Sequence, residues 1–411
     1  MTRHTAINRD IVCIALRHIP KVMIMTQAVI ETQNWLALLS VEDVARAVAY
    51  TQGNHWILLA ELGVTLIACA VIYRLGLCAR IADRLNRARA RPNLSAFVAA
   101  FGFFISLTFL TAPFDVYSDW WRERAYDLSR QSLSDWAFQW LSLSVLAVLV
   151  AAALVTMLFG LMRRTEAVWW VWASGVTAFS LITITFLSPL ILEPWMNAYT
   201  PAPRGAVLDA VTALATSAGI EAEAIYIYDG SRQSERFTAN VSGLFGTARI
   251  ALSDTMFLQG ANLAEVRAVV AHEIGHFSKN HILLTLGVYS MLSGLLLFLT
   301  DHVFRALTKQ TGSDLAIHAS RSLPLTYAIF AVLMVVATPI TNSYSRMLEN
   351  AADAYSLQLA NEPDGLANAL IKTASYRAPS PHWLEELLFY SHPSVEFRIL
   401  RAMEHKQEVG S

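Results

Sequence analysis

The run AFQWLSLSVLAVLVAAALVTMLFGLM, at Ala137–Met162, contains no charged residue. A helix needs about 20 apolar residues to cross the hydrocarbon core of a bilayer, so this run is long enough to span a membrane. Four further uncharged runs meet the same criterion: Ser95–Phe114, Ala167–Leu192, Ile282–Thr300 and Ser322–Thr341. The sequence therefore predicts a polytopic, mainly helical membrane protein.

The composition agrees with a membrane protein and excludes other classes. Of the 411 residues, 55% are hydrophobic and only 15% are charged, whereas about 25% of the residues of a soluble domain are charged. The net charge of −1 provides no basic surface, so no nucleic-acid partner is expected. The three cysteines, at positions 13, 69 and 78, have neither metal-ligand spacing nor the number needed for a disulfide framework.

Two further stretches decide the number of spans. Trp56–Cys78 is apolar apart from Glu61 and Arg74, which lie near its ends, where a charged side chain can reach the interface or face the bundle interior. Residues 11–30 are interrupted by charged residues and a proline. They fit a degenerate first span, an interfacial helix or residues upstream of the true start. We therefore expect six membrane helices, or seven if residues 11–30 also cross.

The spans divide the chain into five segments. These are an N-terminal segment (1–55), a four-span region (56–192), a first soluble block (193–281), a two-span hairpin (282–341) and a second soluble block (342–411). In the first soluble block, Arg204–Ala215 has helical periodicity and Ala224–Tyr228 alternates like a strand. Phe237–Gly243 and Arg249–Leu252 predict a hairpin around Gly246. The soluble blocks are therefore expected to form a small α+β domain.

The motif His272-Glu273-Ile274-Gly275-His276 lies in the first soluble block. The residues before it have a helical pattern, and on a helix two histidines four residues apart can bind a single Zn²⁺. Glu273 then lies beside the open coordination position and can take a proton from zinc-bound water. The motif predicts a metalloprotease with one zinc ion per chain.

A catalytic zinc site usually has three protein ligands, and the best third candidate is Glu349. Asp353 follows it by four residues, so on a helix it can hydrogen-bond a ligand imidazole while Glu349 binds the metal. Two spans separate the motifs, which places both on one side of the membrane. His276 and Glu349 are six and eight residues from those spans, or about 9 and 12 Å at helical rise. The site is therefore expected at the membrane surface or inside the bundle.

Three further residues are candidates for supporting roles. His392 and Arg398 could reach over the site and stabilise the oxyanion of a tetrahedral intermediate. His281 directly precedes a span and could act in gating, in support of a metal ligand or at the membrane interface. For His281 we favour the interface.

Together these residues resemble the type I CAAX prenyl endopeptidase family of integral-membrane zinc metalloproteases. The resemblance covers roughly Trp56 to Arg401 and rests on several motifs in one order. Besides the His272–His276 motif and the His281 position, they are Pro113-Phe114…Tyr117, Tyr199-Thr200-Pro201, Asp229-Gly230-Ser231-Arg232, Gly243 with Arg249–Thr255, Ser345-Arg346…Glu349…Asp353 and Ser391-His392-Pro393…Arg398.

The resemblance implies a helical bundle that encloses a large intramembrane chamber, capped by the small zinc protease domain. It implies zinc bound by His272, His276 and Glu349, with Glu273 as the base, Asp353 supporting the ligands, and His392 and Arg398 assisting substrate or oxyanion binding. The strand at Thr238, Ala239 and Asn240 would be the edge to which a substrate adds as an extra strand. Here the family usually has Asn-Ala where this chain has Thr238-Ala239.

Two arguments disagree on the orientation in the membrane. Lys and Arg number five in Ala79–Leu94, two at 163–164 and three in Asp301–Arg321, against three in Asp115–Trp136 on the alternate side. The positive-inside rule therefore puts the protease blocks on the face opposite the cytosol, whereas the family implies a site that faces the cytosol. The membrane is a bacterial inner membrane or one of the endoplasmic-reticulum type.

We therefore predict an integral-membrane zinc endopeptidase that hydrolyses membrane-associated or prenylated CAAX-type polypeptides. The alternatives are a multi-span transporter or channel with incidental, structural zinc, and an inactive scaffold that keeps the fold. A transporter predicts mid-span charges and internal symmetry, but five of the six runs are uncharged and no repeat is found. The intact Glu273 argues against a scaffold.

Overall fold

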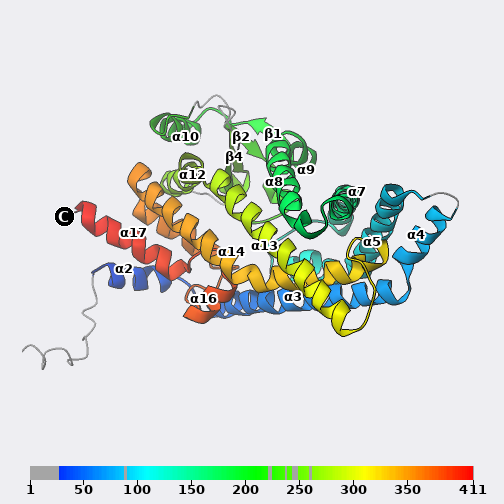
Figure 1. Cartoon of the computed structure of the whole chain (residues 1–411). Coiled ribbons are helices and arrows are strands. Elements are labelled where there is room, and N and C mark those ends of the chain that lie inside the picture. The colour runs from blue at the N-terminus through cyan, green and yellow to red at the C-terminus, as the bar shows by residue number, and fades with distance from the viewer. Residues whose placement is uncertain are drawn as a thin grey trace, which may run out of the picture.

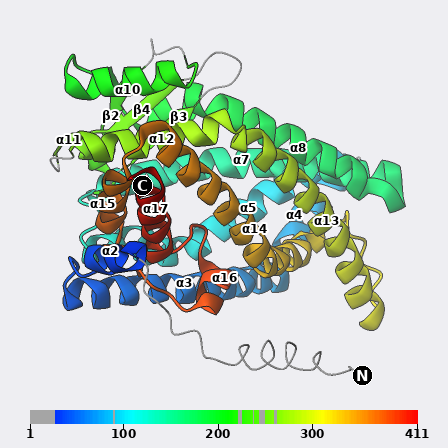
Figure 2. The ribbon, with the colours of Figure 1, turned by 90° about the vertical axis from the view of Figure 1, so that its left-hand side faces the viewer.

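The computed structural model describes residues 27–87, 90–220, 225–236, 238–242, 249–258 and 262–410. The fold is mainly helical and contains one small sheet, which lies near α10 and α12 at the top of Figure 1. The described chain begins with α2 (Gln27–Leu36), which packs against the C-terminal α17 (Val395–Gly410), as Figures 1 and 2 show. Of the stretch 11–30, residues 11–26 lie outside the described residues, and so does the possible first span.

Five helical stretches among the described residues are long and apolar enough to cross a membrane. They are Val41–Arg74, Pro92–Ala125, Leu133–Met196, His281–Gln310 and Ser320–Ala360. The third has 64 residues and contains two successive helices, α7 (Leu133–Thr165) and α8 (Trp169–Leu187). A short 3-10 turn, η3 (Glu166–Val168), separates them. All six predicted runs therefore lie in membrane-length helical stretches, except for the last residues of Trp56–Cys78.

The bounds of the first span differ from the prediction at both ends. α3 (Val41–Arg74) begins well before Trp56, because the hydroxyl of Ser40 caps it by accepting a hydrogen bond from the Asp43 amide at 3.0 Å. The predicted end at Cys78 is wrong. Gly76 has a φ of 59°, a left-handed conformation that ends a helix and that glycine adopts readily. Cys78 lies instead in α4 (Leu77–Asn86).

The spans pack against one another in pairs, and buried side chains from several of them form one apolar cluster. α5 (Pro92–Asp115) packs against α7, α8 against α13 (His281–Gln310), and α3 against α14 (Leu323–Ala360). Ala99 of α5 and Ala152 of α7 are fully buried in one apolar cluster, and such small residues let helix backbones approach closely. Only 11% to 33% of the most apolar window of each span is buried within the described structure, and the enclosed chamber that the resemblance implies stays a prediction.

The sheet has four strands among the described residues, in the order β1-β2-β4-β3. They are β1 (Tyr199–Pro201), β2 (Ile225–Tyr228), β3 (Ala239–Ser242) and β4 (Arg249–Ser253). β3 and β4 are antiparallel, as the predicted hairpin requires, whereas β2 and β4 are parallel. β3 therefore forms an edge of the sheet, and no described strand pairs with its outer side.

Two helices share an apolar core with this sheet. α10 (Ala206–Ser217) and α12 (Leu263–Ser278) contribute Val211 and Ile274, which cluster with Ile250 of β4. α10 lies within two residues of the predicted helical segment at each end. The helix α12, which carries the HExxH motif, is thus held in place by its packing against the sheet and α10.

α12 also packs closely against α14. A Cβ atom at Gly275 would lie 3.2 Å from the Ala352 backbone, a distance tighter than ordinary van der Waals contact. The Ser356 hydroxyl donates a hydrogen bond to the Ala268 carbonyl at 2.7 Å. This close approach brings the HExxH motif face to face with the segment that carries Glu349.

The remaining described elements connect these parts. They are η2 (Val116–Trp121), α6 (Arg122–Ala125), η4 (Ser188–Leu192), α9 (Glu193–Met196), η5 (Gly230–Arg232), α11 (Thr255–Leu258), η6 (Ser320–Ser322), α15 (Pro363–Thr373) and α16 (Trp383–Phe389). α15 packs against both α12 and α17. α15 therefore lies between the HExxH helix and the C-terminal helix α17.

Candidate active site

Four residues on two helices meet where α12 contacts α14. His272 and His276 are one turn apart on α12, and Glu349 and Asp353 are one turn apart on α14, so each pair shares a helix face. One ligand atom from each of His272, His276 and Glu349 lies within 4.8 Å of the others. The fold therefore brings together the three residues predicted to bind metal.

The donor atoms of these three residues face a common point. Nε2 of His272 lies 3.4 Å from Oε2 of Glu349, and Nε2 of His276 lies 3.5 Å from Oε1 of Glu349. Oε2 of Glu349 is buried and has no hydrogen-bond donor among the described residues. Two imidazole nitrogens and one carboxylate oxygen are a usual donor set for a catalytic zinc site. These residues therefore fit a bound metal ion.

Two further side chains orient the imidazoles from behind. Oδ1 of Asp353 lies 2.8 Å from Nδ1 of His272, and Nδ1 of His281 lies 2.9 Å from Nδ1 of His276. Because each Nδ1 is engaged, each Nε2 is turned toward Glu349. His281 is only 5% exposed, so its position fits support of His276 and not the interface role that the sequence favoured.

Arg398 reaches the site from α17 and binds Asp353. Its Nε and Nη2 atoms donate to Oδ2 and Oδ1 of Asp353, both at 2.7 Å. Burial disfavours the charged guanidinium, but the neighbouring carboxylate outweighs this and raises the pKa of Arg398. Both oxygens of Asp353 are thus committed to Arg398, which fixes the carboxylate in place. Direct contact of Arg398 with a substrate stays a prediction.

A cleft of about 160 Å³ opens beside the donor residues. It is lined by Glu273, by Thr238 just before β3 and by Ala239 of β3. The Glu273 carboxylate has no hydrogen-bond or ion-pair partner in the described part of the chain, and burial raises its pKa. Asn240, the next residue of β3, is not among the residues that line the cleft.

Two of the imidazoles beside Glu349, those of His392 and His272, have pKa values shifted in opposite directions. Nε2 of His392 lies 3.5 Å from Oε1 of Glu349, and burial together with the charge of Arg377 lowers the pKa of His392 to about 3. Burial also disfavours the charged form of His272, but the hydrogen bond with Asp353 and the nearby carboxylate of Glu349 outweigh it and raise the pKa of His272 to about 10. The lowered pKa of His392 favours its neutral form, which keeps one N–H to donate.

One wall of the cleft was not found by sequence reasoning. Thr373, at the end of α15, and Tyr376 and Arg377 just after it, line the cleft. They belong to no motif. In the sequence, Arg377 is one of several charged residues between the Glu349 and His392 motifs, and its position there predicts no site.

Comparison with known families agrees with this fold and site. Residues 201–406 match the model described as peptidase family M48, and residues 31–198 match the model described as CAAX prenyl protease N-terminal, five membrane helices. Fold and site thus define an integral-membrane metalloprotease. The chain belongs to peptidase family M48, which confirms the resemblance that its motifs show.

Individual relatives include bacterial and eukaryotic proteins. An uncharacterized metalloprotease of Bacillus subtilis, YhfN, is 26% identical, and the match covers 74% of this chain and 74% of the relative. CAAX prenyl protease 1 of Saccharomyces cerevisiae is also 26% identical, and that match covers 73% of this chain and 70% of the relative. The crystal structure of S. mikatae Ste24p shares the fold, with a TM-score of 0.73, 21% identity, and coverage of 89% of this chain and 90% of that one.

The Asp353→Asn variant should bind metal about 10- to 100-fold more weakly than the wild type. An amide does not balance the charge of Arg398, and it cannot accept hydrogen bonds at both of its polar atoms. Metal retained per chain during titration with a chelator measures the change. Asp364→Asn is the matched control, because Asp364 is 54% exposed and pairs with Lys406 at the surface. Equal chelator sensitivity of Asp353→Asn and wild type would contradict this account of Asp353.

Proposed function

We propose that the protein is a zinc-dependent endopeptidase that hydrolyses membrane-associated polypeptides, with zinc held by His272, His276 and Glu349. The convergence of these three donors beside the unpaired carboxylate of Glu273 is the observation that supports this function. A donor set of this kind serves metal-assisted hydrolysis, and a nearby free carboxylate supplies the base.

The chain's own residues account for the proton transfers of the reaction. Zinc at this site would polarise the scissile carbonyl and make an attacking water more acidic. Glu273 takes one proton from that water as the water oxygen bonds to the carbonyl carbon. Glu273 then gives the proton to the amine as the C–N bond breaks. Its burial favours this role, because a carboxylate with a raised pKa is a stronger base.

His392 and Arg398 support the same step in different ways. His392 is neutral at pH 7 and lines the cleft, so its N–H can donate to the oxyanion that develops on the carbonyl. Arg398 acts through Asp353, which it holds against His272. We therefore assign oxyanion stabilisation to His392 and positioning of the ligand shell to Arg398.

The edge strand β3 provides a place for the substrate backbone. Its outer side has no partner among the described strands, and Thr238 and Ala239 border the cleft. An extended peptide can therefore add to the sheet at β3 and present a bond to Glu273. The Thr238 carbonyl accepts a hydrogen bond from the Ser253 amide at 3.0 Å, so the backbones of Thr238 and of Asn240, two residues on, face β4. Ala239 between them offers its backbone to the substrate.

The position of the site favours substrates that lie at the membrane. His276 is five residues before the start of α13, and Glu349 lies on α14, the helix that also forms the last span. Several relatives are named CAAX prenyl proteases, so prenylated CAAX-type polypeptides are included in the substrate class that we propose.

The Glu273→Gln variant should keep its zinc and lose turnover by about 100-fold or more, because the amide cannot accept the proton. The measurement is cleavage of casein by detergent-purified protein, with zinc content determined on the same sample. Glu404→Gln, at an exposed position of α17, is the control and should cleave casein at the wild-type rate. Full activity of Glu273→Gln would overturn the proposed mechanism.

Strand addition at β3 makes a separate prediction about the substrate backbone. A strand offers alternate N–H groups to its neighbour, so N-methylation at every second residue beside the scissile bond should slow cleavage about tenfold. Methylation at the intervening residues should have a small effect. The measurement is kcat/KM for a series of singly methylated peptides. Equal effects at all positions would show that the substrate does not pair with β3.

A further inference from the structure

Arg377 is a cationic residue of the cleft that has no counter-ion in the described structure. It follows α15 and lines the cleft together with Glu273, Glu349 and His392. No hydrogen bond or ion pair joins its side chain to any described residue, and its Cζ lies 5.6 Å from the centre of the Tyr376 ring. Burial lowers the pKa of Arg377, as expected for a partly desolvated guanidinium.

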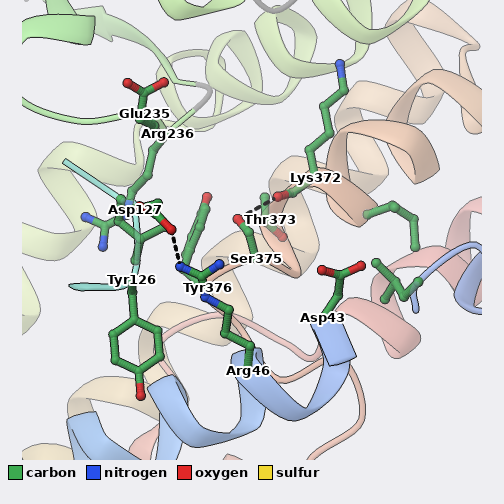
Figure 3. Close-up of a pocket in the computed structure, with 13 residues that line it drawn as sticks. Asp43, Arg46, Tyr126, Asp127, Glu235, Arg236, Lys372, Thr373, Ser375 and Tyr376 are labelled. Atoms are coloured by element: carbon green, nitrogen blue, oxygen red, sulfur yellow. Dashed lines mark hydrogen bonds and ion pairs between the residues drawn. The ribbon is translucent and has the colours of Figure 1, made fainter. Parts of the chain in front are cut away.

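The other cations around the cleft are all paired. Arg398 binds Asp353 inside the site. Tyr376 and Thr373 also line a neighbouring pocket of about 300 Å³, shown in Figure 3, which contains three more cations. Each has a carboxylate partner: Arg46 with Asp127 at 2.6 Å, Arg236 with Glu123 at 3.0 Å and Lys372 with Glu265 at 2.6 Å. Arg377 differs from these four cations because no described residue pairs with its side chain.

None of the described carboxylates of the cleft forms an ion pair with Arg377. Asp353 is matched by Arg398, and Glu349 faces the point where a divalent metal would bind. Glu273, the remaining carboxylate of the cleft, forms no ion pair with Arg377. With a metal bound, the guanidinium of Arg377 is therefore a positive charge that faces the space a substrate enters.

We propose that Arg377 binds a carboxylate of the polypeptide substrate and so determines which peptides are cleaved. Arginine is suited to this because its planar fork donates two parallel hydrogen bonds to a carboxylate. The carboxylate belongs to an acidic side chain near the scissile bond or to the C-terminus of the substrate. This inference rests on the proposed function, since it assigns a specificity residue to the same cleft.

The surroundings of Arg377 strengthen such a pair. Leu366, Ala369 and Leu370 of α15 line the same cleft. Apolar walls exclude water, and an ion pair between desolvated groups is stronger than one at an open surface. We therefore expect the anionic residue of a good substrate to lie next to an apolar residue that contacts α15.

The experiment uses full-length, zinc-loaded protein and peptides from casein whose cleavage by the wild type has been mapped by mass spectrometry. Each peptide is made in three forms: unchanged, with a C-terminal amide, and with its acidic side chains replaced by Asn or Gln. The variants are Arg377→Gln and, as control, Arg267→Gln, whose exposed side chain on α12 pairs with Glu362. KM and kcat are measured for every combination.

For the wild type and Arg267→Gln, KM for either the C-terminal amide or the peptide with Asn and Gln in place of its acidic residues should be about 10- to 100-fold higher than for the unchanged peptide. The value of kcat should change little. The form that does so identifies the source of the carboxylate. Arg377→Gln should cleave all three forms with the same KM and kcat. These values should equal those of the wild type for the form that lacks the recognised carboxylate. Affinity of the same peptides for Glu273→Gln, with and without Arg377→Gln, should show the same pattern without turnover.

The proposal is overturned if the wild type does not discriminate among the forms, or if Arg377→Gln slows all three equally. The second result would assign Arg377 to the chemical step or to the fold. Failure of the proposed function gives a different result, because Glu273→Gln would then retain turnover whatever Arg377 does.

Discussion

The charge cluster around Asp353 is the interaction on which the rest of the site depends. Asp353 of α14 bonds His272 of α12 and Arg398 of α17, so one carboxylate joins three helices. All three side chains are buried, and removing one member of a buried charge pair costs about 3–5 kcal/mol. The orientation of the His272 imidazole, and hence of the whole donor set, follows from this cluster.

A second constraint comes from the length of α14. Its 38 residues span about 57 Å at helical rise, well beyond the roughly 30 Å hydrocarbon core of a bilayer. One continuous helix therefore forms the last span and carries Glu349 and Asp353. α13 begins at His281, which contacts His276. The donors are thus tied to the membrane through both helices of the hairpin, which supports the proposal that the substrates lie at the membrane.

The spans and the donor set were predictable because each has a local signature. Length and the absence of charge define a span, and the four-residue spacing of His272 and His276, or of Glu349 and Asp353, defines a helix face. The end of α3 was missed because one left-handed glycine, Gly76, decides it. The environment of Arg377 could not be predicted, because its lack of a partner among the described residues depends on how distant segments pack and leaves no pattern in the sequence. The same holds for the pairing of Arg398 with Asp353 from another helix.

The central claim is that Glu349 completes a zinc site with the two histidines of α12. Metal content by mass spectrometry of wild-type protein and Glu349→Ala, both purified in detergent without chelators, tests it most directly. The account predicts about one zinc per chain in the wild type and loss of that zinc in Glu349→Ala, with casein cleavage lost in parallel. No zinc in the wild type, or equal zinc in the two proteins, would contradict it.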